Sequence, residues 1–156
     1  SIFNLLSHSS KLNFDIQDSN IIDLFSGSGS FGLECISRGA KDVIFVENYK
    51  DALEILKKNI SNLNANNLVK IIEKNCFDYI NSLNPLNNEY DLIFLDPPFK
   101  EKNISRILSK IKEANIFDKK GIIIIHRNFK ENDLFSELKI IEEKKYGISK
   151  ILFCKF

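Results

Sequence analysis

Glycines and acidic residues follow the apolar runs of this chain at positions where they could hold a ligand. The first run leads into Gly27-x-Gly29-x-x-Gly32. Gly27 and Gly29 permit a tight turn and a close approach of the backbone to a ligand, while Gly32 lets the following helix pack against a sheet. As a bare pattern this is the dinucleotide-binding fingerprint, although glycine-rich turns also serve only to redirect the chain.

Two carboxylates indicate which ligand this loop would take. Asp23 shortly precedes Gly27, where it would repel a pyrophosphate but could accept a hydrogen bond from an ammonium group. Glu47 ends the second apolar run, at a spacing typical of an acid that binds both hydroxyls of a ribose. An adenosine with an aminoacyl tail and no phosphates satisfies both, which predicts S-adenosylmethionine. A helix-capping or loop-closing role is the alternative for Asp23.

The segment Asn-Cys-Phe-Asp-Tyr-Ile at 75–80 follows the third apolar run and begins a helix. Asn75 or Asp78 could bond the adenine amino group, with Cys76 and Phe77 along the ring plane. A plain helix start with Asn75 as its cap is an equally good interpretation. The full set of expected cofactor contacts is Asp23, Phe25, Gly27, Gly29, Gly32, Glu47, Asn75, Cys76 and Asp96.

The most specific signal is Leu-Asp-Pro-Pro-Phe at 95–99. Pro97 and Pro98 fix the backbone, remove two amide donors and leave carbonyl groups to accept hydrogen bonds. Together with the Asp96 carboxylate and the Phe99 ring, they suit a planar base whose exocyclic amino group is held and reacted. We therefore expect these four residues to be catalytic. The alternative is a rigid loop with Phe99 in the core.

The elements that must position these residues alternate along the chain, as in an α/β fold with a parallel sheet and crossover helices on both faces. Residues 1–6 have the pattern of an amphipathic helix, 84–90 that of a surface loop, and 138–145 with 149–156 that of a closing antiparallel hairpin. The other expected strands are 21–25, 43–46, 69–72, 92–95 and 122–126, and the expected helices are 31–38, 51–63, 76–83 and 103–114.

Composition bounds the remaining possibilities. The 156 residues are 44% hydrophobic and 28% charged with a formal net charge of +1, which is typical of a single soluble domain. Cys35, Cys76 and Cys154 are scattered, so neither a metal site nor a disulfide is expected. No run is long enough to span a membrane and no signal peptide is evident, so we expect a cytoplasmic protein. Separately, we expect a monomer.

These motifs, in this order and spacing, resemble those of class I S-adenosylmethionine-dependent amino-methyltransferases. The segments "DLFSGSGSFGLECISRGAKDVIFVE", "FLDPPF" and "YGISKILFCKF" are similar, more narrowly, to the bacterial RsmD family, which methylates the N2 amine of one guanine in 16S ribosomal RNA. The resemblance covers nearly the whole chain. It implies one Rossmann-like methyltransferase domain over 1–156, with a seven-stranded sheet in the order 3-2-1-4-5-7-6 and strand 7 antiparallel.

The resemblance also implies a substrate and a mechanism. The partner would be 16S ribosomal RNA or the 30S subunit or its assembly intermediate, and Asp96 and the Pro97 carbonyl would accept the two N–H bonds of the guanine amine. The base would be flipped out of its stack against Phe99. Family members carry a segment before the part matched here, so the natural N-terminal segment is expected to be missing from this chain.

Basic residues after the strand ends could contact phosphates, although for any single lysine a merely solvated side chain is the simpler interpretation. His126 ends the fifth strand and could approach the substrate, with a structural role as the commoner alternative, and His8 is expected at the surface. The residues expected at the RNA are Lys100, Lys102, Arg127, Lys130, Lys144 and Lys145.

Three other functions stay open at this point. The same aspartate–proline motif would serve the N6 amine of adenine in DNA or RNA. A non-catalytic domain that binds RNA or the cofactor and assists ribosome assembly would need only part of this set of residues. A nicotinamide dehydrogenase is the weakest alternative, because Asp23 disfavours a pyrophosphate.

Overall fold

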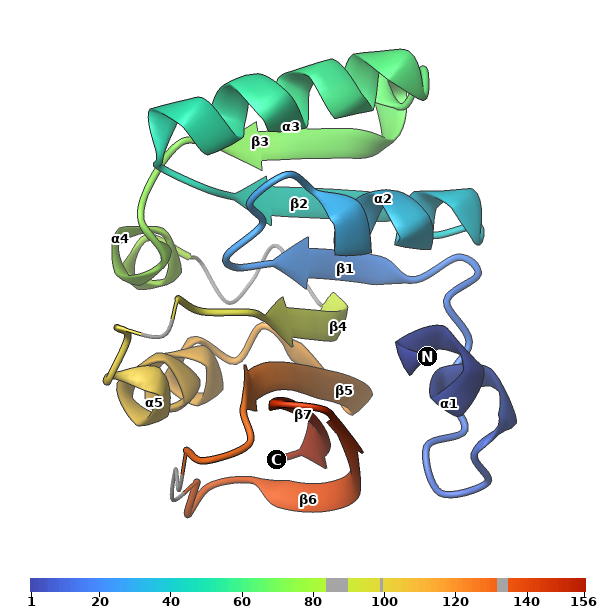
Figure 1. Cartoon of the computed structure of the whole chain (residues 1–156), viewed down its shortest axis with the longest axis vertical. Coiled ribbons are helices and arrows are strands. Elements are labelled where there is room, and N and C mark those ends of the chain that lie inside the picture. Colours follow the sequence, from blue (N-terminus) through green and yellow to red (C-terminus); the bar gives the residue numbers. More distant parts are fainter. Residues whose placement is uncertain (84–89, 99, 132–134) are drawn as a thin grey trace.

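The computed structural model describes residues 1–83, 90–98, 100–131 and 135–156. In these ranges one seven-stranded sheet has the order β3-β2-β1-β4-β5-β7-β6, which runs from top to bottom in Figure 1. Neighbours from β3 to β5 pair in parallel, and β7 is antiparallel to β5 and β6. The predicted order and hairpin are confirmed. The strands are β1 (Asn20–Asp23), β2 (Asp42–Val46), β3 (Val69–Ile72), β4 (Tyr90–Leu95), β5 (Phe117–Asn128), β6 (Lys139–Tyr146) and β7 (Ser149–Lys155).

Helices cover both faces of the sheet, as predicted. The apolar sides of α1, α2 and α3 pack on one face, and those of α4 and α5 pack on the other. Ser1 caps the first helix, because its side chain accepts a hydrogen bond from the backbone N–H of Asn4. The helices are α1 (Ile2–His8), α2 (Ser30–Ser37), α3 (Lys50–Asn62), α4 (Cys76–Asn81) and α5 (Ile104–Ala114), with a 3₁₀ turn η1 (Asn66–Leu68).

Alternate residues of each strand fill two separate apolar clusters. In β1, for example, Ile21 lies in the cluster under α1–α3 and Ile22 in the cluster under α4 and α5. Since strand side chains alternate between the two faces, the residue two positions after a cluster member continues on the same face. The residues that follow on the α1–α3 face are Asp23 after Ile21, Glu47 after Phe45, Asp96 after Phe94 and His126 after Ile124.

Among the boundaries that differ from the predictions are the starts of β4 and β5. Tyr90, expected in a surface loop, is buried and begins β4, and its backbone N–H donates to Ile116. β5 begins at Phe117 rather than at 122, because Phe117 pairs with Tyr90 across a register shift. The polar residues after Phe117 give no apolar run from which this extension could be predicted. Residues 84–89 of the expected loop lie outside the described part of the chain.

Candidate active site

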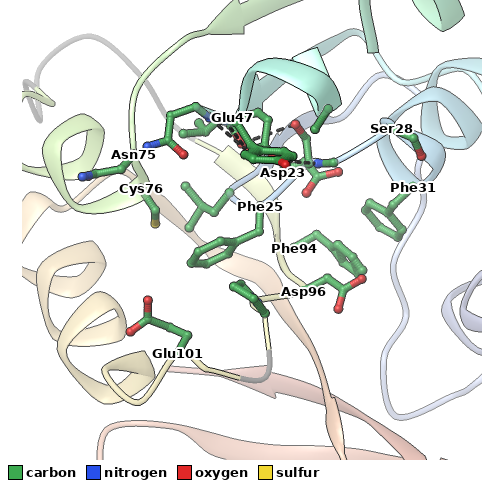
Figure 2. Close-up of a pocket in the computed structure, with 18 of the residues that line it drawn as sticks. Asp23, Phe25, Ser28, Phe31, Glu47, Asn75, Cys76, Phe94, Asp96 and Glu101 are labelled. Carbon is green, nitrogen blue, oxygen red and sulfur yellow. Dashed lines mark hydrogen bonds between the residues drawn. The ribbon is translucent and has the colours of Figure 1, made fainter. Parts of the chain in front are cut away.

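A cavity of about 920 Å³ opens at the carboxyl edge of the parallel strands. Its walls come from the loops after β1, β2 and β4 and from the start of α4, and Ile2 of α1, Phe31 of α2 and Ala52 of α3 complete them. Figure 2 shows these side chains converging on one space. The structure therefore brings most of the predicted site together. The predicted residues that line the cavity are Asp23, Phe25, Gly27, Glu47, Asn75, Cys76, Phe77, Asp96, Pro98 and Lys100.

Asp23 is the buried carboxylate of this cavity. The residue is 2% exposed, and its Oδ1 atom has no hydrogen-bond partner. Burial raises its pKa to about 8, and the nearby charges of Asp96 and Glu47 act in the same direction. A buried carboxylate without a cation is costly, so the site favours a ligand that brings a positive charge to Asp23.

Glu47 is held by backbone donors at the end of β2. Its Oε1 atom accepts from the N–H of Gly27 at 2.9 Å, and its Oε2 atom accepts from the N–H groups of Asn48 and Tyr49 at 3.0 and 3.1 Å. The carboxylate thus ties the glycine loop to the start of α3. A carboxylate has about four acceptor positions, so capacity remains for a hydroxyl donor from the cavity.

The three glycines of the loop have different roles. Gly27 lines the cavity with φ +53, and a Cβ there would meet nothing within 4 Å. Gly29 and Gly32 are not among the residues that line the cavity, and their role as cofactor contacts stays a prediction. A Cβ on Gly29 would lie 2.4 Å from Leu56, and one on Gly32 would lie 2.3 Å from Phe45. These two glycines let α2 pack against α3 and the sheet.

The start of α4 forms another wall. The side chain of Asn75 caps the helix by accepting from the N–H of Asp78 at 2.8 Å, so the capping interpretation is correct, and the residue also lines the cavity. Asp78 is not a lining residue, which leaves Asn75 of the two predicted partners for an adenine. Burial raises the pKa of the Cys76 thiol to about 12, so this side chain is neutral and offers an apolar contact.

Asp96 is the exposed carboxylate of the site. Its side chain is 50% exposed, and its Oδ1 atom lies 2.9 Å from Nδ1 of His126. The pairing of β4 with β5 explains this contact, because the last register pairs, Phe94 with Ile124 and Leu95 with Ile125, place Asp96 beside His126 one step further. The hydrogen bond to Asp96 raises the pKa of His126 above its ordinary value.

One carbonyl group of the proline pair accepts a hydrogen bond within its own loop. Pro97 is buried, and the carbonyl of Pro98 accepts from the N–H of Glu101 at 2.9 Å. The Pro98 carbonyl thus has a hydrogen bond within its own loop, whereas the predicted acceptor is the carbonyl of Pro97. Phe99, predicted as a stacking face, lies outside the described residues.

Aromatic rings on the other side of Asp96 were not predicted. Phe31 and Phe94 line the cavity and stack with ring centroids 3.9 Å apart, and Figure 2 shows both beside Asp96. Phe3 of α1 stacks on Phe31 at 5.4 Å, with the Arg38 guanidinium over its ring. Phe94 precedes Asp96 by two positions on the same strand, so strand alternation could have placed it here.

The basic residues that were predicted to contact RNA comprise five exposed lysines and one buried arginine. Arg127 was predicted at the RNA, but its side chain is 2% exposed and its guanidinium lies 3.6 Å from the Glu131 carboxylate. This prediction is wrong, because the side chain of Arg127 is buried on the face that α4 and α5 cover, which is also the face of Ile125. The exposed lysines are Lys100, Lys102, Lys130, Lys144 and Lys145.

The family model described as "Conserved hypothetical protein 95" matches residues 1–155. The chain belongs to this family. Ribosomal RNA small subunit methyltransferase D of Haemophilus influenzae is 32% identical over 137 residues, which cover 85% of this chain and 69% of that protein. The protein of the same name from Buchnera aphidicola subsp. Baizongia pistaciae is 33% identical over 135 residues, which cover 86% of this chain and 64% of that protein. The chain thus spans about two thirds of these relatives.

Solved structures agree with this assignment. A methylase from Haemophilus influenzae superposes with a TM-score of 0.79 at 29% identity, covering 99% of this chain and 92% of that one. A conserved hypothetical protein from Streptococcus pyogenes gives 0.82 at 27% identity, covering 89% and 86%. The resemblance to the RsmD family and the methyltransferase fold are confirmed. This member of the family carries an S-adenosylmethionine-dependent methyltransferase domain, with S-adenosylmethionine as its cofactor.

The residues of this family member fit that cofactor. Asp23, with its unpartnered oxygen, can accept from the ammonium group of the aminoacyl tail, and Glu47 can accept from ribose hydroxyls. Asn75, Cys76 and Phe77 offer polar and apolar contacts for an adenine ring. Among the described residues, no cluster of potential metal ligands is found, and no helix is long and apolar enough to cross a membrane.

Proposed function

We propose that this chain transfers a methyl group from S-adenosylmethionine to the exocyclic N2 amine of a guanine in small-subunit ribosomal RNA. The observation that carries the proposal is that one cavity holds two unlike carboxylates, namely Asp23, which is buried with an unpartnered Oδ1 atom, and Asp96, which is half-exposed. The relatives named as small-subunit ribosomal RNA methyltransferases support the substrate class. Residues 1–156 would form one domain for this reaction.

Asp96 and the Pro97 carbonyl are the proposed acceptors for the substrate amine. The amine of guanine is a poor nucleophile because its lone pair is delocalised into the ring. Two fixed acceptors for its N–H bonds favour a pyramidal nitrogen whose lone pair is free to react. When bound, the cofactor supplies a methyl group activated by its sulfonium sulfur. Asp96 then accepts the proton that the methylated amine releases.

The surface beyond Asp96 supports binding of a nucleic acid. The turn between β6 and β7 docks on the loop after β5, because the N–H of Phe129 donates to Ile148 at 2.8 Å. Phe129, Tyr146 and Ile148 are 40%, 39% and 66% exposed, although large apolar side chains are usually covered. Exposed lysines flank these rings, namely Lys130, Lys144 and Lys145. Rings that can stack on bases and cations that can bind phosphates are typical of RNA-binding surfaces.

Mass analysis of nucleosides tests the proposal. Small ribosomal subunits from cells that lack the encoding gene are incubated with the chain and with S-adenosylmethionine carrying a labelled methyl group. The RNA is then digested to nucleosides. We expect the label in N2-methylguanosine. Label in N6-methyladenosine would establish the adenine alternative, and cofactor binding without any transfer would favour a non-catalytic domain.

A further inference from the structure

His126 contacts the proposed catalytic carboxylate directly. Its Nδ1 atom lies 2.9 Å from Oδ1 of Asp96, and the two side chains are 35% and 50% exposed. An ionised carboxylate only accepts hydrogen bonds, so the proton of this bond is on Nδ1 of the imidazole. The contact therefore uses one oxygen of Asp96 and leaves Oδ2 for another donor.

The sheet makes this contact rigid. His126 lies inside β5, where Ile125 pairs with Leu95 of β4 on one side and His126 pairs with Ile151 of β7 on the other. Asp96, by contrast, lies one residue beyond the end of β4 in a loop that leads to the prolines. A strand residue thus supports a loop residue through a hydrogen bond, and support from a regular element restricts the geometry of a functional side chain.

We propose that His126 is a positioning residue, whose Nδ1–H group holds Oδ1 of Asp96 so that Oδ2 is presented to the amino group of the substrate. The inference rests on the proposed function, since it takes Asp96 as the acceptor for that amine. His126 itself need not touch the substrate. Its contribution is to remove the rotational freedom of the carboxylate before the reaction.

The charge on the imidazole should affect the reaction as well. Asp96, in the loop after β4, is the charged group beside His126. The strand partner of His126 on β7, Ile151, is apolar, and Lys144 of β6 pairs with Ile151. The hydrogen bond with Asp96 raises the pKa of His126 above its ordinary value of 6.5. An imidazolium would oppose the positive charge that develops on the amine. Turnover should therefore rise with pH as His126 loses its proton.

Two variants separate the hydrogen bond from the volume and charge of the imidazole. His126→Asn keeps a neutral N–H donor at the position of Nδ1, and His126→Leu keeps an apolar side chain of similar width without a donor. We expect kcat for labelled-methyl transfer to small ribosomal subunits to fall about tenfold in His126→Leu, the size of one lost hydrogen bond, with KM nearly unchanged. His126→Asn should recover to within about threefold of the wild-type kcat, and its pH profile should be flat where the wild type rises.

Two further measurements complete the test. The chain has two histidines, so NMR of the imidazoles in His8→Leu reports His126 alone, and its pKa should fall in Asp96→Asn. Calorimetry with S-adenosylhomocysteine should show unchanged cofactor affinity in both His126 variants. The inference is overturned if His126→Leu keeps the wild-type kcat while Asp96→Asn has lost it. If Asp96→Asn turns over normally, the proposed role of Asp96 itself fails, and the inference fails with it.

Discussion

Asp23 ends β1, Asp96 directly follows the neighbouring strand β4, and both line the same cavity, but their surroundings are opposite. Asp23 is 2% exposed and its pKa is raised to about 8, chiefly by burial. The side chain of Asp96 is 50% exposed and has a histidine as its hydrogen-bond partner. In the proposed function, the half of the edge around β1 and β2 pairs a buried carboxylate with the cation of the cofactor. The half around β4 and β5 presents an exposed carboxylate to a large substrate.

The largest expected effect on cofactor binding is at Asp23. Asp23→Asn removes the charge that would pair with the ammonium group, so affinity for S-adenosylhomocysteine should fall about 10- to 100-fold. Calorimetry measures this loss. Unchanged affinity would show that Asp23 does not hold the aminoacyl tail.

In the protein without cofactor, by contrast, the charge of Asp23 should lower the stability of the folded state. A buried acid with a raised pKa makes the folded state bind a proton more tightly than the unfolded state does. The free energy of unfolding should therefore fall as pH rises from about 4, the ordinary value for an aspartate, to about 8, and then level off. Asp23→Asn should lack this decline. Denaturant unfolding at several pH values compares the two proteins, and parallel curves would contradict the burial of a titrating Asp23.

A smaller effect distinguishes Gly27, which lines the cavity, from Gly29, which packs against α3. Both Gly27 and Gly29 have positive φ, but only at Gly29 would an added Cβ collide, 2.4 Å from Leu56. Gly29→Ala should lower the free energy of unfolding by about 2 kcal/mol or more, and Gly27→Ala by about 1 kcal/mol. Gly27→Ala should weaken cofactor binding instead, since Gly27 lines the cavity.

Unfolding in urea and calorimetry on the same two variants give both quantities. Equal losses of stability would show that the packing of α2 against α3 tolerates a methyl group at Gly29. An unaltered cofactor affinity in Gly27→Ala would remove that glycine from the cofactor site.

The smallest effect is expected at the open half. Lys130→Glu should weaken binding of small-subunit ribosomal RNA several-fold and reduce its salt dependence, with cofactor affinity unchanged. Lys112→Glu is the matched control, because Lys112 is exposed in the last turn of α5, close in sequence to the amino end of β5 and not to the carboxyl end where the site lies. Filter binding at several salt concentrations compares them, and equal losses in both variants would mean that the charge effect is not local.

Several residues of the two halves could be predicted from the sequence. Asp23, Glu47 and Asp96 each follow an apolar strand, and parallel strands bring their carboxyl ends to one edge. Strand alternation places Arg127 on the same face as Ile125, but helices cover both faces of the sheet, so the burial of Arg127 depends on packing that the alternation does not specify. The packing role of Gly32 was predicted and agrees with the structure, where its missing Cβ atom would strike Phe45 of β2, whereas the contact of Gly29 with Leu56 depends on where α3 packs, which the local pattern does not specify.

The contact between His126 and Asp96 could not be predicted from the sequence, for a different reason. Each residue can be placed at the end of its own apolar run, but their distance depends on the register between β4 and β5. A shift by one residue would turn one of the two side chains to the other face. The stacking of Phe3 on Phe31 likewise depends on where α1 packs, which local patterns do not specify.

The most direct test of the account is the behaviour of Asp96→Asn in a single turnover. Chain in excess over small ribosomal subunits is mixed with labelled S-adenosylmethionine, and the rate of methyl transfer is compared with S-adenosylhomocysteine affinity from calorimetry. We expect the rate to fall by at least about 100-fold, since a fixed charged acceptor is lost, while the affinity changes by less than about threefold. A rate that stays near that of the wild type, or a rate that falls only in step with lost cofactor affinity, would contradict the division between the two carboxylates.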